Sequence, residues 1–163
     1  MVTMGMGHFY AILGAAFAII FAGIGSAIGV GRAAQASAAL VSKQPDKFSK
    51  TIVLQVMPST QGLYGFVVAF IVLIQTGAIG GLKAVTPEMG LTILAYSLPI
   101  ALAGMISAIM QGNVAVSCVG LIGKHEEESS HAIIMLIFVE LFALFAFLIS
   151  FLGIMLLDIP AIA

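Results

Sequence analysis

Glu140 is the residue of this chain whose position most strongly indicates chemistry. It lies in AIIMLIFVELFALFAFLISFLGIMLL (residues 132–157), a stretch that is long and apolar enough to span a bilayer and holds no other charge. An ionisable side chain near the membrane centre costs about 2.5–3.5 kcal/mol, so such groups usually face a partner or an ion path. Two interpretations follow: a carboxyl group that takes part in ion transfer, or a protonated one that hydrogen-bonds a neighbouring helix. An apolar residue would span at lower cost, which favours the first.

A second set of polar residues lies in the earlier apolar segment LQVMPSTQGLYGF. Four of them share one helical face, because they are spaced i, i+3, i+4 and i+7: Met57, Thr60, Gln61 and Tyr64. Pro58 has no N–H to donate and is expected to kink this helix, which loosens nearby carbonyl groups.

Gln111, in the third apolar segment, adds another amide. Together these hydroxyl, amide, phenol and carbonyl groups supply oxygen ligands around one negative charge, as a hard monovalent cation requires when it sheds water. Each alone is more typical of hydrogen bonding between membrane helices, worth about 0.6 kcal/mol on average. The shared face, the proline and the lone carboxylate together favour an ion site.

The composition is typical of an integral membrane protein, with 61% hydrophobic and 8% charged residues and a mean hydropathy of +1.20. The chain has no basic run, so nucleic acid is not an expected partner. Ser and Cys have no partnered base, so nucleophilic catalysis has no support. We expect no organic cofactor. His8, His125 and His131 lie at segment ends or in loops, where we expect solvated side chains.

Four apolar segments are separated by three short polar breaks. Because unpaired backbone groups are not tolerated in hydrocarbon, each segment is expected to be a transmembrane helix, which predicts an all-α membrane protein. The segments are about His8–Val41, Thr51–Ile79, Gly90–Ile122 and Ala132–Leu157. The first and third exceed the roughly 20 residues needed to cross, so they should tilt or project beyond the bilayer.

The first and third breaks must lie on one side of the membrane. They carry Lys43, Lys47, Lys50 and Lys124, whereas the middle break carries Lys83 alone. The positive-inside bias therefore places loops 42–51 and 123–131 in the cytoplasm and both termini outside.

An internal repeat divides the chain. A shift of 81 positions superimposes AGIGSAIGVGRAA (22–34) on AGMISAIMQGNVA (103–115), and GFVVAF (65–70) on AFLISF (146–151). The sequence thus predicts two tandem helical hairpins, residues 1–81 and 82–163, in a parallel repeat. Under this shift Glu140 pairs with Ser59, so only the second hairpin carries the carboxylate.

Small residues recur four apart in the first and third helices, among them Gly25 and Gly29 in the first and Ala108 and Gly112 in the third. In lipid, such stripes let backbones approach closely. Two long stripes predict a tight inner layer shared between subunits.

With these features the sequence resembles the rotor-ring proteolipids (K or c subunits) of V/A-type ATPases in their duplicated four-helix form. The likeness is greatest to the bacterial proteolipids that carry sodium. The resemblance covers nearly the whole chain and depends on GIGSAIGVG, PSTQGLYGF, IMQGNVA and Glu140. It implies that Na⁺, or alternatively H⁺, is held by Glu140, Gln111, Gln61, Thr60 and the Met57 carbonyl. It also implies that Tyr64 orients the carboxylate of Glu140.

The resemblance also implies a mechanism and partners. Identical subunits would form a ring in a bacterial plasma membrane, with the first and third helices inside and the second and fourth outside. A membrane stator subunit of the a/I type would deliver and release the ion, and the central stalk would contact the cytoplasmic loops. Catalysis of ATP hydrolysis or synthesis would belong to other subunits.

Two other classes of protein are alternatives. A small four-helix cation-coupled antiporter also has a membrane glutamate, but it needs no fused duplication, and the absence of Trp argues against it. A purely structural four-span protein would explain the small-residue stripes but not the oxygen cluster.

Overall fold

The computed structural model describes residues 4–81 and 83–160, most of them in helices. The elements, in chain order, are α1 (Met6–Val41), η1 (Pro45–Lys47), α2 (Phe48–Val56), η2 (Met57–Ser59), α3 (Thr60–Gln75), α4 (Pro87–Lys124), η3 (Glu126–Glu128) and α5 (Ser129–Met155). Four runs are long and apolar enough to cross a membrane: Met6–Val41, Pro45–Gln75, Pro87–Lys124 and Glu126–Met155. The predicted all-α fold with four spanning helices is confirmed.

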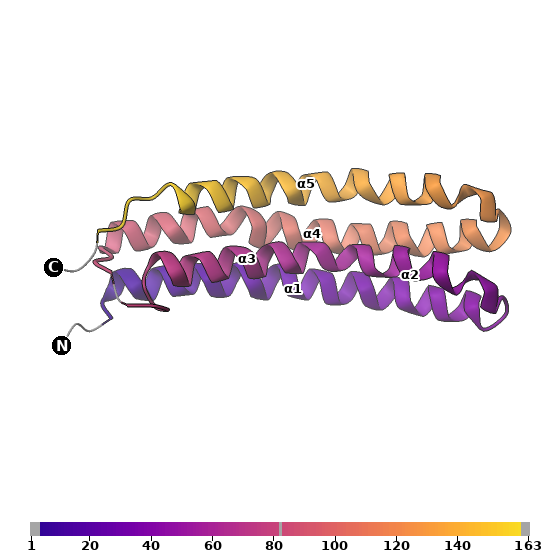
Figure 1. Cartoon of the computed structure of the whole chain (residues 1–163), viewed down its shortest axis with the longest axis horizontal. Helices are drawn as coiled ribbons and strands as arrows, with labels where there is room; N and C mark the ends of the chain where they lie inside the picture. Colours follow the sequence, from indigo (N-terminus) through magenta and orange to yellow (C-terminus); the bar gives the residue numbers. More distant parts are fainter. Residues whose placement is uncertain (1–3, 82, 161–163) are drawn as a thin grey trace.

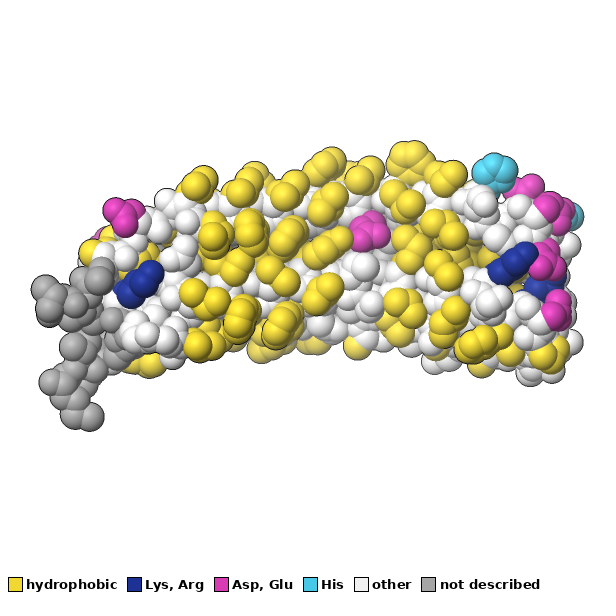
Figure 2. Space-filling model, in the orientation of Figure 1, with side chains coloured by type: hydrophobic (Ala, Val, Ile, Leu, Met, Phe, Trp, Pro, Cys, Tyr) yellow, Lys and Arg dark blue, Asp and Glu magenta, His cyan; other side chains and the backbone are white. Residues whose placement is uncertain are grey.

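The four spans lie lengthwise in one long bundle (Figure 1). The α1–α2 and α4–α5 connections lie at one end, and the two termini with the α3–α4 connection lie at the other. On the face shown in Figure 2, hydrophobic side chains form a band between two ends that carry most of the charge, with an acidic side chain inside the band. A bilayer requires this distribution.

α1 and α4 run parallel and touch through their backbones. A Cβ atom built on Gly25 would lie 2.6 Å from the Cα of Met105, and one built on Gly112 would lie 2.4 Å from the Cα of Gly29. The partners in each pair are about one repeat length apart in the chain. The two hairpins therefore pack side by side in the same direction, which confirms the parallel repeat.

A polar pair shows the same register. Arg32 donates from Nη1 to Oδ1 of Asn113 at 2.7 Å, and the two residues are 81 positions apart. Arg32 and Asn113 are therefore equivalent positions of the two hairpins. Because they contact each other, the hairpins are aligned without an offset.

The small-residue stripes of α1 and α4 pack on each other within one chain, whereas the prediction placed them between subunits. Gly25, Gly29, Ala108 and Gly112 are buried against one another inside a single chain. The expectation that they form a layer between subunits needs correction for these four residues. Because the duplication places two copies of the stripe on one polypeptide, each copy finds the other intramolecularly.

Each hairpin is itself a packed pair of helices. A Cβ on Gly65 of α3 would lie 2.4 Å from the Ala18 carbonyl oxygen of α1. In the second hairpin, the Ser150 hydroxyl of α5 accepts the Ile100 N–H of α4 at 3.2 Å. Small or polar residues thus set the spacing of both pairs, as in other membrane bundles.

The second span ends earlier than the predicted Ile79. α3 stops at Gln75, and Gly77 has φ +70°, in the left-handed region that favours glycine. Its N–H donates to the Ile74 carbonyl, so the chain turns there.

His8 also differs from its prediction. Its side chain is only 4% exposed, whereas His125 and His131 are exposed and contact Glu127 and Glu128. The backbone of Gly7 packs directly on residues 85–90, which covers the first turn of α1.

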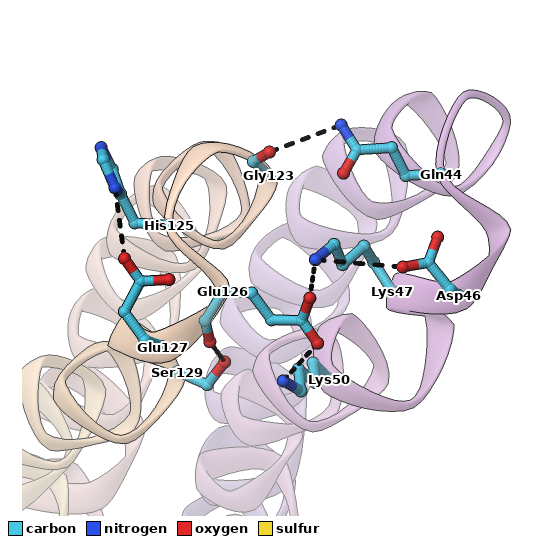
Figure 3. A network of polar contacts seen from close by, with 9 residues as sticks. All are labelled: Gln44, Asp46, Lys47, Lys50, Gly123, His125, Glu126, Glu127 and Ser129. Atoms are coloured by element: carbon cyan, nitrogen blue, oxygen red, sulfur yellow. Dashed lines mark hydrogen bonds and ion pairs between the residues drawn. The ribbon is translucent and has the colours of Figure 1, made fainter.

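The loops at residues 42–51 and 123–131 lie side by side (Figure 3). Two spans separate them in the chain, so the sequence predicts both loops on the same side of the membrane. Glu126 pairs with both Lys47 and Lys50, and Gln44 donates to the Gly123 carbonyl at 3.4 Å. These contacts join the two hairpins at the loop end of the bundle.

We expect Gly25→Leu to separate α1 from α4, because the added side chain would occupy the position of the Met105 backbone. Overpacking of this kind costs about 1–3 kcal/mol or more. Thermal unfolding of the detergent-solubilised protein, followed by circular dichroism, should show a lower midpoint. Gly120→Leu is the matched control, because no described atom outside the adjoining turns of its own helix lies within 4 Å of a Cβ at Gly120. Equal midpoints for the two variants would contradict the proposed contact.

Candidate ion-binding site

The second span is interrupted where the sequence places Pro58. Residues Met57–Ser59 form a 3₁₀ turn that divides the span into α2 and α3. Here the Met57 carbonyl accepts both the Thr60 N–H and the Thr60 hydroxyl, the latter at 3.0 Å. The same hydroxyl lies 3.3 Å from Oε1 of Gln61. Three oxygen atoms of one turn are therefore collected at the break, as the proline predicts.

Two buried glutamines link this turn to the second hairpin. Gln61 and Gln111 are both 0% exposed, and Nε2 of Gln61 donates to Oε1 of Gln111 at 2.9 Å. Gln111 in turn donates to the Leu136 carbonyl of α5 at 3.0 Å. Buried amides must be hydrogen-bonded, so this chain of contacts fixes the positions of α3, α4 and α5 around the site.

Glu140 lies on α5, one helical turn after Leu136, whose carbonyl accepts from Gln111. It is half-buried, and its Oε1 accepts the Tyr64 hydroxyl at 2.8 Å. The Tyr64 ring stacks on Phe147 with centroids 4.9 Å apart, which limits the directions that the phenol can take. The carboxylate is thus held by a residue of the first hairpin.

The six residues singled out in the sequence come from three helices and a turn, and their contacts form two sets. One set joins Met57, Thr60, Gln61 and Gln111, and the other joins Tyr64 and Glu140. The first set collects carbonyl, hydroxyl and amide oxygens. Glu140 lies one helical turn beyond Leu136, whose carbonyl accepts from Gln111 of that set. Among the described residues, no three His, Cys, Asp or Glu side chains group together. A site with one formal charge and neutral oxygens is suited to a monovalent cation.

Two serines that the sequence analysis did not single out contact residues of the site. Ser107 accepts from Nε2 of Gln61 at 3.4 Å and donates to the Val139 carbonyl at 2.9 Å. Ser26 accepts the Gly62 N–H at 2.8 Å. The two serines are 81 residues apart, and this shared position in both hairpins was the available signal.

Ser59 occupies in the first hairpin the position of Glu140 in the second. Its hydroxyl is exposed and donates to the Val56 carbonyl of its own helix at 2.7 Å. The first hairpin therefore has no carboxylate at the position equivalent to Glu140.

Comparisons with known proteins agree with this architecture. The family of the ATP synthase C subunit matches the chain twice, at residues 13–72 and 94–153. The V-type sodium ATPase subunit K of Enterococcus hirae is 43% identical over 152 residues, which cover 93% of this chain and 94% of the relative. The A-type ATP synthase subunit K of Methanocaldococcus jannaschii is 36% identical over 140 residues, 86% of this chain and 59% of the relative.

More distant similarity extends to animal proteins. The V-type proton ATPase 16 kDa proteolipid of Bos taurus is 27% identical over 142 residues, which cover 87% of this chain and 88% of the relative. Both family matches fall on one hairpin each, in agreement with the packed parallel repeat. The chain therefore belongs to the ATP synthase C-subunit family, as a non-catalytic rotor-ring proteolipid of the V/A-type ATPases in duplicated four-helix form.

Proposed function

We propose that this chain carries Na⁺ across the membrane at Glu140, with the Met57 carbonyl, Thr60, Gln61 and Gln111 as further ligands and Tyr64 as the residue that orients the carboxylate. The observation that carries the proposal is the buried pair of glutamines, which joins the oxygens of the Pro58 turn to the region of Glu140. The similarity to a protein named V-type sodium ATPase subunit K supports it.

The physical argument for sodium concerns the number of oxygen atoms. A proton carrier needs only a carboxyl group whose burial favours the protonated form. It has no use for buried amides beside it, each of which must be desolvated to sit there. Sodium does need them, because a carboxylate alone does not replace its hydration shell. The two fully buried glutamines thus favour Na⁺ over H⁺.

Binding would neutralise Glu140 and let the site move past lipid without exposing a bare charge. A membrane stator subunit would open the site to water on each side, and a central-stalk subunit would contact the ring at the joined loops. We propose that loops 42–51 and 123–131 face the cytoplasm of a bacterial cell and that both termini lie outside; the excess of lysine in these loops supports the orientation.

Labelling by a hydrophobic carbodiimide tests the proposed ion, because the reagent modifies the protonated carboxyl group. At fixed pH and ionic strength, Na⁺ should slow labelling of the purified ring, whereas K⁺ should not. Lower pH should speed it, because protons and Na⁺ would compete for the same oxygen atoms. Glu140→Gln should abolish both labelling and coupled transport while the ring still assembles, since the amide is neutral and similar in size. Equal labelling rates in Na⁺ and K⁺ would identify the proton as the ion.

Single substitutions should show how much each neutral ligand contributes to Na⁺ binding. Thr60→Ala and Gln111→Ala should each raise the Na⁺ concentration that protects half of the sites by about 5- to 140-fold, because losing one partner in a buried polar site costs about 1–3 kcal/mol. Thr51→Ala is the matched control: Thr51 is also buried, but its hydroxyl donates only to the Phe48 carbonyl outside the site. If all three variants shift protection equally, Thr60 and Gln111 are not ligands.

A further inference from the structure

The side-chain amide of Gln61 has two unlike ends, and only one of them can bind a cation. Oε1 has lone pairs, whereas Nε2 carries two N–H groups that only donate. Gln61 is 0% exposed, so contacts with the protein decide which end faces the ion. The orientation of this amide must therefore be fixed by its hydrogen-bond partners.

The first N–H group of Gln61 is directed by Gln111. The Leu136 carbonyl can only accept a hydrogen bond, and Nε2 of Gln111 donates to it at 3.0 Å. This contact turns Oε1 of Gln111 towards Gln61, where it accepts from Nε2 at 2.9 Å. A backbone carbonyl of α5 thus sets the direction of this route.

The second N–H group is directed by Ser107, which lies one turn before Gln111 in α4. Ser107 is 5% exposed, and its hydroxyl donates to the Val139 carbonyl at 2.9 Å. A hydroxyl has a single hydrogen, so Ser107 presents only lone-pair density to Gln61 and accepts from its Nε2 at 3.4 Å. Again a carbonyl of α5 sets the direction.

The two routes begin three residues apart on α5, in the turn before Glu140, and end on the same nitrogen atom. With both hydrogens of Nε2 engaged, Oε1 of Gln61 faces the Pro58 turn, where it lies 3.3 Å from the Thr60 hydroxyl. A flipped amide would place Oε1 against two acceptors and lose both hydrogen bonds. The network thus holds the oxygen of Gln61 towards the other proposed ligands.

We infer that Ser107 is a positioning residue for the ion: its hydroxyl keeps Oε1 of Gln61 turned to the site and so favours Na⁺ over H⁺ at Glu140. The inference rests on the proposed Na⁺ function and assigns this serine a part in ion choice. A flipped amide would present the partial positive charge of its N–H groups to the cation. A proton bonded to the carboxyl group needs no amide oxygen, so its binding does not depend on Ser107.

Ser107→Ala tests this role without removing a proposed ligand. In the carbodiimide assay on purified rings, the Na⁺ concentration that protects half of the sites should rise about 2- to 12-fold, the range that corresponds to one net hydrogen bond. The pH dependence of labelling in K⁺ should stay unchanged, because proton binding does not use the amide. Native mass spectrometry should show the ring assembled.

Ser97→Ala is the matched control. Ser97 is also a buried serine of α4, but its hydroxyl donates to the Ile93 carbonyl of the same helix at 2.8 Å. It should change neither titration. An unchanged Na⁺ requirement in Ser107→Ala would refute the inference. A shift of the pH dependence in K⁺ as large as the shift in Na⁺ protection would also refute it, because that result indicates a general disturbance around Glu140.

A double substitution tests whether Ser107 acts through Gln61. Gln61→Ala removes a proposed ligand and should itself weaken Na⁺ protection. Once this amide is absent, adding Ser107→Ala should change Na⁺ protection little, because the group that the serine positions is gone. An equal further loss in both backgrounds would show that Ser107 acts by another route.

The same titrations separate this inference from the proposed ion. Equal labelling rates in Na⁺ and K⁺ for the unsubstituted ring would overturn the Na⁺ proposal itself. Protection that is specific for Na⁺ and that Ser107→Ala leaves intact would overturn only the positioning role of the serine.

Discussion

The backbone contact between α1 and α4 is the constraint on which the rest of the structure depends. Membrane helices have no hydrophobic drive to associate, so close van der Waals contact must hold them. Here glycines of the two parallel helices meet without intervening side chains. This contact sets the separation of the two hairpins, and with it the distance over which Gln61 reaches Gln111 and Tyr64 reaches Glu140.

The site is accordingly a property of the paired hairpins. The first hairpin supplies the Pro58 turn and the phenol, and the second supplies Gln111 and the carboxylate. Ser107 bridges them, since it accepts from Gln61 and donates to the carbonyl of the residue before Glu140. At the loop end, Glu126 joins the same two hairpins through Lys47 and Lys50 (Figure 3). Contacts at mid-membrane and at the loops thus hold one arrangement.

Much of this was predictable because it depends on patterns of residue type. Apolar length gave the spans, Pro58 gave the helix break, and the 81-residue repeat gave the parallel hairpins. Contacts between particular pairs of residues were harder to predict from the sequence. A stripe of small residues shows that something approaches closely, but it does not say whether the partner is in the same chain, so Gly25 and Gly29 were assigned to the wrong contact. Likewise, the serine hydroxyls at 26 and 107 look like small packing residues until the opposite helix is in place.

The serine at position 59 has a mechanical consequence. With one carboxylate for each pair of hairpins, a ring made of this chain takes up half as many ions per revolution as a ring of the same circumference with an acid in every hairpin. Fewer ions share the energy of each turn, so every ion can be driven against a proportionally steeper electrochemical gradient. A serine in place of an acid at position 59 therefore lowers the number of ions moved per revolution and raises the driving force available to each ion.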